Sequence, residues 1–302
     1  MAIILITGGT GLVGKALSNR LISEGHEVRI LSRNPKSLSK IKSFFWDVKS
    51  QKIDESAFDN VEHIIHLAGA GIADSRWTEA RKKEIIDSRV NSMALITSVV
   101  KKKQIQLKSF VGASAIGIYG MITSNKIFSE TDLGNDDFLT YSCLHWEKSY
   151  EEIEHLTQKK CILRIGIVLS DKGGALAKLL PIFKLGLGSP TGSGLQYMPW
   201  IHLDDLVSIF HQALFNPKLS GLYNAVAPDH VTNREFSEKL AESLSKPFFM
   251  PSVPEFMLHL IFGEMANILL KGSRISDQKL LNSNFVFQYP TLSEALKSFS
   301  LS

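Results

Sequence analysis

A glycine-rich segment near the N-terminus has the spacing of a phosphate-binding turn. It reads Thr7-Gly8-Gly9-Thr10-Gly11-Leu12-Val13-Gly14 and follows a short apolar run. Such turns use one glycine to bend, another to let the backbone approach a pyrophosphate, and a last one to pack helix on strand. The start of the helix offers amide donors and the positive end of its dipole. We therefore predict a dinucleotide site formed by Gly8, Gly9, Thr10, Gly11, Leu12, Val13 and Gly14.

The next expected strand ends without the acidic residue that selects NAD. An NAD-selective site usually places Asp or Glu about 20 residues beyond the glycines, where it accepts from the ribose 2′-hydroxyl. Ser32 and Arg33 stand there instead. The hydroxyl can donate a hydrogen bond, and the guanidinium can pair with a 2′-phosphate. An exposed turn arginine is the alternative, but we expect NADP(H) in preference to NAD(H).

The composition indicates a globular protein. The chain has 302 residues, of which 44% are hydrophobic and 21% charged, and these values exclude disorder and coiled coil. The basic residues behind the net charge of +4 are scattered, which argues against a nucleic-acid partner. The longest apolar stretch, Phe256–Leu270, is interrupted by polar residues and is shorter than the roughly 18 residues of a membrane span. We therefore expect no membrane insertion.

The cysteines and the N-terminus bear on the compartment. Two cysteines, Cys143 and Cys161, are too few for a disulfide scaffold or a Cys-rich zinc site. The chain enters a strand-like run at once, without the basic region and cleavage site of a secretory signal. We therefore expect free thiols, no metal site and a cytoplasmic location.

Short β-branched runs alternate with amphipathic segments in the first half of the chain. Strands are expected at Ile3–Ile6, Glu27–Leu31, Ser43–Trp46, His63–Leu67, Phe110–Ala113 and Cys161–Leu169. Helices are expected at Val13–Ser23, Ala80–Lys101 and Phe138–Leu156. This alternation predicts an α/β protein with a doubly wound parallel sheet, the Rossmann fold.

The pattern changes after Ser170. A loop with four glycines follows at residues 186–194, and prolines cluster around residues 247–254. Leu222–Val226 has the character of a strand again. We therefore predict a Rossmann domain over residues 1–170 with a return strand near 221–227. Residues 171–302 would form a smaller, mainly helical substrate-binding part that is interleaved with it.

Taken together, these motifs resemble the short-chain dehydrogenase/reductase superfamily, in particular its extended branch of NAD-dependent epimerases and dehydratases. The pattern T-G-x-x-G-x-x-G is similar to that of the branch, and further matches lie at residues 66–70, 114–120 and 200–205. A finer similarity is to the atypical YfcH-like "epimerase family proteins". It rests on residues 76–79, 88–89, 183–188, 192–194 and 200–202. The resemblance covers nearly the whole chain.

The resemblance implies positions for the parts of the cofactor. Gly8 to Gly14 would hold the pyrophosphate, and Ser32 with Arg33 the 2′-phosphate. Asp47 would contact the adenine, although a polar strand end is the alternative for this residue. The ribose side would be contacted by Leu67, Ala68, Gly69 and Ala70, and Ile167 would lie near the nicotinamide.

The catalytic pattern of the superfamily is incomplete in this chain. Its dehydrogenases pair a tyrosine with a lysine four residues later, because a nearby cation lowers the pKa of the phenol that exchanges the proton. The neighbouring serine is present as Ser114. One register places Tyr141 and His145 in the tyrosine and lysine positions, and the other places Leu139 and Cys143 there.

Helical periodicity favours the second register. Leu139, Cys143 and Trp146 belong to a continuous apolar stripe, whereas Tyr141 and His145 lie on a polar one. Tyr141 is therefore expected to face solvent or a partner subunit. Cys143 would line the nicotinamide site, either as an active thiol or as a small buried hydrophobe.

Two arginines and a tryptophan are candidates for substrate contacts. Arg89 stands where the extended branch usually has an asparagine, and it can clamp a phosphate, a carboxylate or the cofactor amide. A surface ion pair with Glu84 or Asp87 is the alternative. Arg76 and Trp77 could supply an anion contact and a stacking face.

Further candidates lie in the matched segments around Tyr119 and Trp200. Tyr119 is either a proton donor or packs under its loop. Trp200 and His202 are candidate substrate contacts, and the alternative for His202 is a buried histidine with satisfied hydrogen bonds. An aspartate of the pair Asp204-Asp205 is expected to cap the next helix. The loop of residues 186–194 would be a lid or a mobile hairpin.

Two functions compete on this basis. The first is an NADP(H)-dependent oxidoreductase or epimerase-like enzyme acting on a small polar, nucleotide-sugar-like substrate. Ser114 would orient that substrate, Arg89 or Arg76 would bind its charge, and Cys143, Tyr119 or water would supply a proton. The second is a non-catalytic NADP(H)-binding sensor or scaffold, which the missing tyrosine and lysine favour. A membrane-surface role for residues 256–270 is weaker than packing, and the long helices offer a surface for a homodimer.

Overall fold

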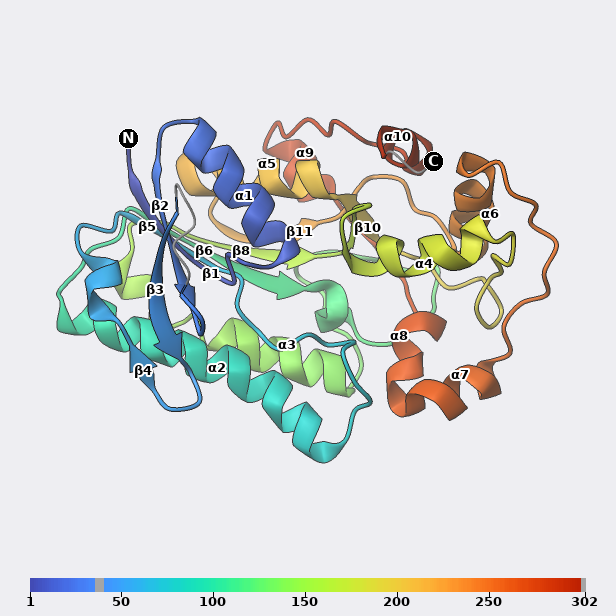
Figure 1. Cartoon of the computed structure of the whole chain (residues 1–302), viewed down its shortest axis with the longest axis horizontal. Coiled ribbons are helices and arrows are strands. Elements are labelled where there is room, and N and C mark those ends of the chain that lie inside the picture. The colour runs from blue at the N-terminus through green and yellow to red at the C-terminus, as the bar shows by residue number, and fades with distance from the viewer. Residues whose placement is uncertain (36–40, 300–302) are drawn as a thin grey trace.

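A single large sheet forms the centre of the molecule (Figure 1). The computed structural model describes residues 1–35 and 41–299. The order of the strands is β11-β8-β6-β5-β1-β2-β3-β4, and every neighbouring pair is parallel except β3 and β4. The strands are β1 Ile3–Thr7, β2 Glu27–Ser32, β3 Lys42–Asp47, β4 Lys52–Ile53, β5 His63–His66, β6 Ser109–Ala115, β8 Lys160–Ile165 and β11 Gly221–Ala225.

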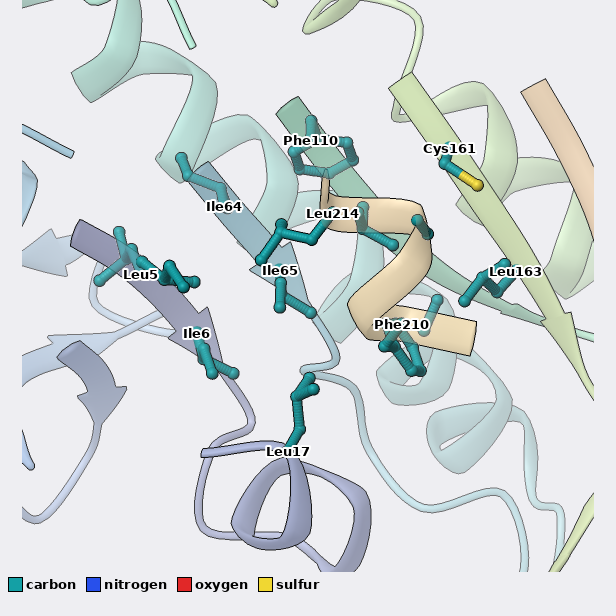
Figure 2. Close-up of a cluster of buried hydrophobic side chains, with 14 of the residues drawn as sticks. Leu5, Ile6, Leu17, Ile64, Ile65, Phe110, Cys161, Leu163, Phe210 and Leu214 are labelled. Carbon is teal, nitrogen blue, oxygen red and sulfur yellow. The ribbon is translucent and has the colours of Figure 1, made fainter. Parts of the chain in front are cut away.

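Helices cover both faces of this sheet (Figure 1). One face carries α1 (Leu12–Ser23) and α5 (Leu203–Phe215), and the other carries α2 (Glu79–Lys102) and α3 (Phe138–Lys148). Figure 2 shows Leu17 of α1, Phe210 of α5 and Ile65 of β5 within one buried cluster. A parallel sheet covered on both faces buries near-continuous apolar strands, which confirms the predicted doubly wound Rossmann fold.

The segment predicted as one strand at Cys161–Leu169 is two strands, so that prediction is wrong. Gly166 separates β8 from β9 (Ile167–Leu169). A Cβ atom at Gly166 would lie 2.7 Å from the carbonyl oxygen of Pro199, so the absence of a side chain lets the two backbones approach. Beyond this point the chain leaves the main sheet, and β9 pairs with β10 (Trp200–His202).

The helix predicted at Phe138–Leu156 is shorter than expected. It ends at Lys148, and the chain continues into a turn and the 3₁₀ segment η3 (Glu154–Leu156). Tyr150 and Ile153 are still fully buried. The hydroxyl of Tyr150 donates to the carbonyl oxygen of Ala113 in β6 at 2.7 Å. Burial of these two side chains against the sheet therefore continues the apolar stripe without the helix.

Most of the remaining elements form a mainly helical region at the right of Figure 1. Its helices are α4 Gly174–Lys184, α6 Asn233–Ser243, α7 Glu255–Phe262, α8 Asn267–Leu270 and α10 Leu292–Ser298. Helix α9 (Gln278–Asn282) lies apart from them and packs against β11 of the main sheet. Short strands β7 (Ile127–Phe128) and β12 (Arg274–Ile275) pair with each other. The other 3₁₀ segments are η1 Glu55–Phe58, η2 Ile116–Tyr119 and η4 Gly263–Ala266. A second apolar cluster, which includes Trp200 and Phe236, fills this region, while β11 returns to the main sheet beside β8.

The apolar stretch of residues 256–270 is divided among α7, η4 and α8. In the described part of the chain, none of the helices combines the length and apolar character required to cross a membrane.

The close approach at Gly166 makes a test of this architecture. We expect Gly166→Ala to lower the free energy of unfolding by about 1 to 3 kcal/mol, because the added methyl group must displace the backbone at Pro199. Urea unfolding measures this change. Gly173→Ala is the matched control, since a Cβ there would meet only Leu12, at an ordinary 3.5 Å. Equal stability of the two variants would show that the backbone near Pro199 can accommodate a side chain at position 166, so that a glycine is not required there.

Candidate cofactor and active site

The glycine turn between β1 and α1 has the shape that a pyrophosphate requires. Gly8 has a positive φ of 68°, and a Cβ atom at Gly14 would lie 2.4 Å from the carbonyl oxygen of Gly8. Gly11 precedes α1, and no side chain caps this helix. The amide groups of its first turn are therefore free to bind an anion. The residues present fit a dinucleotide at this turn.

A buried histidine network holds the next loop against the glycine turn. The Oγ1 atom of Thr7 accepts from the amides of Leu67 and Ala68, each at 3.2 Å. It also lies 2.7 Å from Nδ1 of His66, whose Nε2 lies 3.1 Å from the hydroxyl of Ser92 on α2. Burial lowers the pKa of His66 to about 3. This uncharged imidazole therefore joins β1, β5 and α2 beneath the predicted ribose contacts.

The other residues of that loop are also held in place. The amide of Ala70 donates to the hydroxyl of Ser88 on α2 at 2.9 Å. A Cβ atom at Gly8 would lie 3.0 Å from the backbone of Leu67, so the glycine turn and residues 67–70 are in direct contact. The structure thus brings together two segments that the sequence analysis assigned to the same cofactor.

The predicted adenine and 2′-phosphate contacts lie at the carboxyl ends of β2 and β3. Ser32 ends β2, and Arg33 follows it with an exposed side chain. Asp47 ends β3, where its carboxylate accepts from the hydroxyl of Ser50 at 2.6 Å and the amide of Lys49 at 3.1 Å. The Ser50 hydrogen bond, helped by the charge of Arg33, lowers the pKa of Asp47. Because β1, β2 and β3 are adjacent and parallel, these residues share the edge that carries the glycine turn.

A buried ion pair dominates the other end of the site, and the sequence analysis missed it. Glu147 on α3 accepts from Nε and Nη2 of Arg164 on β8, at 2.8 and 2.9 Å. The two side chains are only 14% and 4% exposed. Ser114 donates to the same carboxylate at 2.7 Å and is itself buried. An arginine within an otherwise apolar strand was the available signal, since arginine is almost never fully buried without a partner.

Tyr119 is held by the same arginine. Its hydroxyl donates to Oδ1 of Asn224 at 2.6 Å and accepts from Nη1 of Arg164 at 3.1 Å. The ring is fully buried, and burial raises the pKa of the phenol to about 12. Asn224 on β11 also escaped the sequence analysis. The structure therefore places Tyr119 in a packing arrangement beneath its loop.

The inward stripe of α3 is oriented as its periodicity predicts. Cys143 and Trp146 are buried, whereas Tyr141 is 50% exposed and its ring lies 4.0 Å from that of His145. A Cβ atom at Gly117 would lie 3.4 Å from Sγ of Cys143, so η2 covers the sulfur. Burial raises the pKa of Cys143 to about 12. The side chain is therefore a protonated thiol at neutral pH.

Arg89 lies between the ribose-side loop and α3. Its guanidinium stacks on the ring of Trp146 at 4.5 Å, and Nη1 donates to the carbonyl oxygen of Ile85 at 2.8 Å. The surface ion pair considered for this residue does not form. Glu84 pairs with Arg81, and Asp87 pairs with Lys83. Both acids are therefore paired with other residues of α2. The guanidinium of Arg89 lies next to Gly69, where a Cβ atom would be 3.1 Å from Cζ of the arginine.

Arg76 and Trp77 are tied to their surroundings. Arg76 is exposed and donates to the carbonyl oxygens of Leu260 and Ile261 near the end of α7, at 2.5 and 2.7 Å. Trp77 is buried, and its indole N–H donates to the carbonyl oxygen of Ile72 at 2.9 Å. Its ring packs edge-on against Phe138 at the start of α3. Both residues therefore fasten the loop before α2 to other elements.

Trp200 and His202 on β10 are likewise buried. Trp200 is paired in register with Ile167, and its indole N–H donates to the carbonyl oxygen of Asp229 at 3.1 Å. The Nε2 atom of His202 lies 3.0 Å from the hydroxyl oxygen of Ser298. Its Nδ1 accepts from the amide of Asp204, so His202 caps α5.

The prediction that an aspartate caps α5 is therefore wrong. The carboxylate of Asp205 instead accepts from the amides of Gln288 and Tyr289, at 2.7 and 3.0 Å. It is buried against the returning C-terminal segment, where those two amides need an acceptor. The histidine ring next to the helix start is free to take the capping position.

Hydrogen bonds hold the glycine loop of residues 186–194 against the helical region. The amide of Thr191 donates to Asn233, and that of Gly192 donates to the carbonyl oxygen of Val253. Gly194 accepts from the amide of Arg234 at the start of α6. In this structure the loop belongs to the framework of the helical region and is neither an open lid nor a free hairpin.

Comparison with known proteins shows which family the chain resembles over most of its length. Residues 4–225 match the family model described as "NAD dependent epimerase/dehydratase family", and residues 253–299 match a domain of unknown function, DUF1731. "Epimerase family protein YfhF" of Bacillus subtilis is 33% identical over 97% of this chain and 96% of that protein.

Two solved structures are similar in fold. The crystal structure of human epimerase family protein SDR39U1 (isoform 2) with NADPH has a TM-score of 0.88 and 31% identity, covering 99% of each chain. UDP-glucuronic acid 4-epimerase from Bacillus cereus, in complex with UDP-glucuronic acid and NAD, has a TM-score of 0.76 and 18% identity. It covers 98% of this chain and 96% of its own. The second likeness is one of fold alone.

The buried ion pair is open to a direct test. We expect Glu147→Gln to lower the free energy of unfolding by about 3 kcal/mol, because it leaves Arg164 charged and buried without a carboxylate. Chemical denaturation measures the loss. The matched control is Glu152→Gln, which removes the same charge from an exposed pair with Lys101 and should change stability by less than about 0.5 kcal/mol. A loss no larger than that of the control would contradict the importance of the buried pair.

Proposed function

Because the chain belongs to the NAD-dependent epimerase/dehydratase family, as an atypical short-chain dehydrogenase/reductase, we propose that it binds NADP(H) and transfers hydride to or from a small polar substrate. The observation that carries this proposal is the glycine turn. Its φ at Gly8, the close packing at Gly14 and the uncapped start of α1 together suit a pyrophosphate. From the glycine turn the cofactor would then extend along the carboxyl edge of the sheet, toward β2 and β3 on one side and toward β5 and β6 on the other.

The choice of NADP(H) rests on the ends of β2 and β3. Arg33 is exposed and follows Ser32, so its guanidinium is accessible to a 2′-phosphate. Asp47 lies near enough to Arg33 to interact with its charge and would orient the adenine side. The relative crystallised with NADPH supports this choice. Leu67, Ala68, Gly69 and Ala70 would contact the ribose side, and Ile167 the nicotinamide.

Side chains for proton transfer are scarce at the nicotinamide end. Bound NADPH would supply a hydride, and reduction of a carbonyl also requires a proton. Ser114 is buried and donates to Glu147, Tyr119 is buried with its hydroxyl engaged, and Cys143 is a covered thiol. We infer that the proton comes from water. Binding of the substrate would then rely on positioning along the cofactor, and the substrate class would be small, polar and nucleotide-sugar-like.

The engaged hydroxyls of Ser114 and Tyr119 and the covered thiol of Cys143 also favour a second candidate, a non-catalytic NADP(H)-binding sensor or scaffold. Such a protein keeps the cofactor site while its polar groups serve packing. Membership of the YfcH-like subgroup, the division at residue 170, a cytoplasmic location and a homodimer also remain predictions from the sequence.

Cofactor selectivity gives the first test of the proposal. We expect Arg33→Ala to weaken NADPH binding about 10- to 100-fold, because charge-assisted hydrogen bonds to the 2′-phosphate are lost. Binding of NADH should change little. Titration calorimetry with both cofactors measures this. Lys42→Ala removes a charge at the opposite, amino end of β3 and should leave both affinities unchanged. An unaltered preference for NADPH in Arg33→Ala would make the assignment wrong.

Turnover separates the two candidate functions. We expect the pure protein to consume NADPH in an extract of small metabolites, and Cys143→Ala to retain most of that rate. A thiol acting as the proton donor would contribute roughly 10²- to 10⁴-fold, so a loss of that size would contradict the role of water. Cys161→Ala is the matched control, because Cys161 is a buried thiol in β8. Tight NADPH binding without turnover would favour the sensor.

A further inference from the structure

The loop between β5 and α2 connects the proposed cofactor site with the helical region. Its first residues, 67–70, are the proposed ribose-side contacts. Its last part contains Arg76, whose exposed guanidinium donates to the carbonyl oxygens of Leu260 and Ile261 in α7, at 2.5 and 2.7 Å. One loop therefore contacts the helical region at one end and would contact the cofactor at the other.

The two carbonyl oxygens that Arg76 binds lie near the end of α7. The helix ends at Phe262, and the last four carbonyl groups of an α-helix have no amide partner within the helix. Arg76 satisfies two of these groups and places a cation at the negative end of the helix dipole. This contact stabilises the end of α7 only while the loop and the helix stay together.

An ion pair joins the same two parts of the molecule. Nζ of Lys82, in the first turn of α2, lies 2.6 Å from the carboxylate of Glu264 in η4, close to α7 and α8 at the lower right of Figure 1. This hydrogen bond raises the pKa of Lys82. The two side chains are 20% and 41% exposed, and exposed ion pairs contribute little to stability. A contact of this strength can break and form again without unfolding of either part.

An apolar cluster lies between the same elements. Met265 of η4 shares it with Trp77 and Ile85, and the side chains of Ala70 and Leu139 pack against these residues. Ala70 is the last of the ribose-side residues, and Leu139 stands where the resemblance expects the tyrosine. The cluster therefore borders the proposed nicotinamide end, and η4 covers it from the side of the helical region.

Hydrogen bonds brace the loop between its two ends. The indole N–H of Trp77 donates to the carbonyl oxygen of Ile72 at 2.9 Å. Nη2 of Arg81 on α2 donates to the carbonyl oxygen of Gly71 at 2.6 Å. A nucleotide that contacts residues 67–70 would therefore act on Arg76 through a short, braced segment.

We propose that Arg76 and Lys82 form a latch, which holds α7 and η4 against the loop after β5 and closes the helical region over a bound dinucleotide. Binding of NADP(H) at residues 67–70 would tighten the latch, and by reciprocity a tight latch would slow release of the cofactor. The inference rests on the proposed function and goes further, since Arg76 becomes a positioning residue that acts through α7 instead of a contact to the substrate.

Hydrogen exchange in the ligand-free protein gives the first test. Exchange of the amides at residues 255–270, measured by mass spectrometry, reports opening of this segment. We expect Arg76→Met to raise the exchange rate there about 3- to 10-fold, because two hydrogen bonds to the end of α7 are lost. Lys83→Met is the matched control. It removes an exposed cation that pairs with Asp87 within α2, and exchange at residues 255–270 should stay unchanged.

The effect of the cofactor gives the second test. Saturating NADPH should slow exchange at residues 255–270 in the wild-type protein, and less so in Arg76→Met and Glu264→Gln. Release of NADPH, measured by stopped-flow displacement, should be about 3- to 10-fold faster in both variants. Glu79→Gln is the matched control for Glu264→Gln. It removes the other carboxylate near Lys82, which lies on α2 itself, and should leave the release rate unchanged.

Three outcomes would overturn the proposal. Unchanged exchange at residues 255–270 in Arg76→Met would show that this arginine does not hold α7. Faster exchange with a wild-type rate of NADPH release would show that the contact serves stability alone. Failure of the wild-type protein to bind NADPH would refute the proposed function, and closure over a cofactor with it. The exchange rates of the ligand-free variants keep this last failure apart from a failure of the latch.

Discussion

The bidentate ion pair between Glu147 and Arg164 is the interaction on which the rest of the site depends. It joins α3 to β8, and through Ser114 it also joins both elements to β6. Arg164 extends the network to Tyr119 and to the carbonyl oxygen of Glu130. Each of these two buried charges depends on the other, because removal of one would leave the other shielded from solvent and without a partner of opposite charge. In this structure the hydroxyls of Ser114 and Tyr119 are therefore both engaged in one hydrogen-bond network.

This commitment gives the two ends of the site different characters. At the end proposed for the adenine, Arg33 is exposed and Asp47 lies at the surface, so these groups can reorganise around a phosphate. At the end proposed for the nicotinamide, Ser114, Tyr119 and Cys143 are buried, and Cys143 lies beneath η2. The two ends meet at the glycine turn, where the neutral His66 network fixes residues 67–70. A site with few accessible titratable side chains suits the binding and positioning of a ligand better than proton transfer by side chains.

The helical region depends on the divergence of β8 and β9 at Gly166. From there the chain forms a separate parallel pair with β10, and Trp200 fills the cluster beneath α4 and α6. His202 caps α5 and Asp205 binds the returning chain near Tyr289. These contacts hold the helical region on the carboxyl edge of the sheet (Figure 1), which is the edge where α/β proteins bind ligands.

The sequence by itself determined the fold class, the glycine turn and the inward stripe of α3, because these depend on local spacing and periodicity. It also placed Ser32, Arg33 and Asp47 after strands that prove to be adjacent. Only the tertiary structure decided which polar side chains meet. Glu147 and Arg164 are 17 residues apart, and Tyr119 and Asn224 are 105 apart. No local pattern records such pairs, since they form only when α3, β8 and β11 pack together. For the same reason, the roles of Arg89, His202 and Gly166 followed from neighbours that the chain brings in from distant segments.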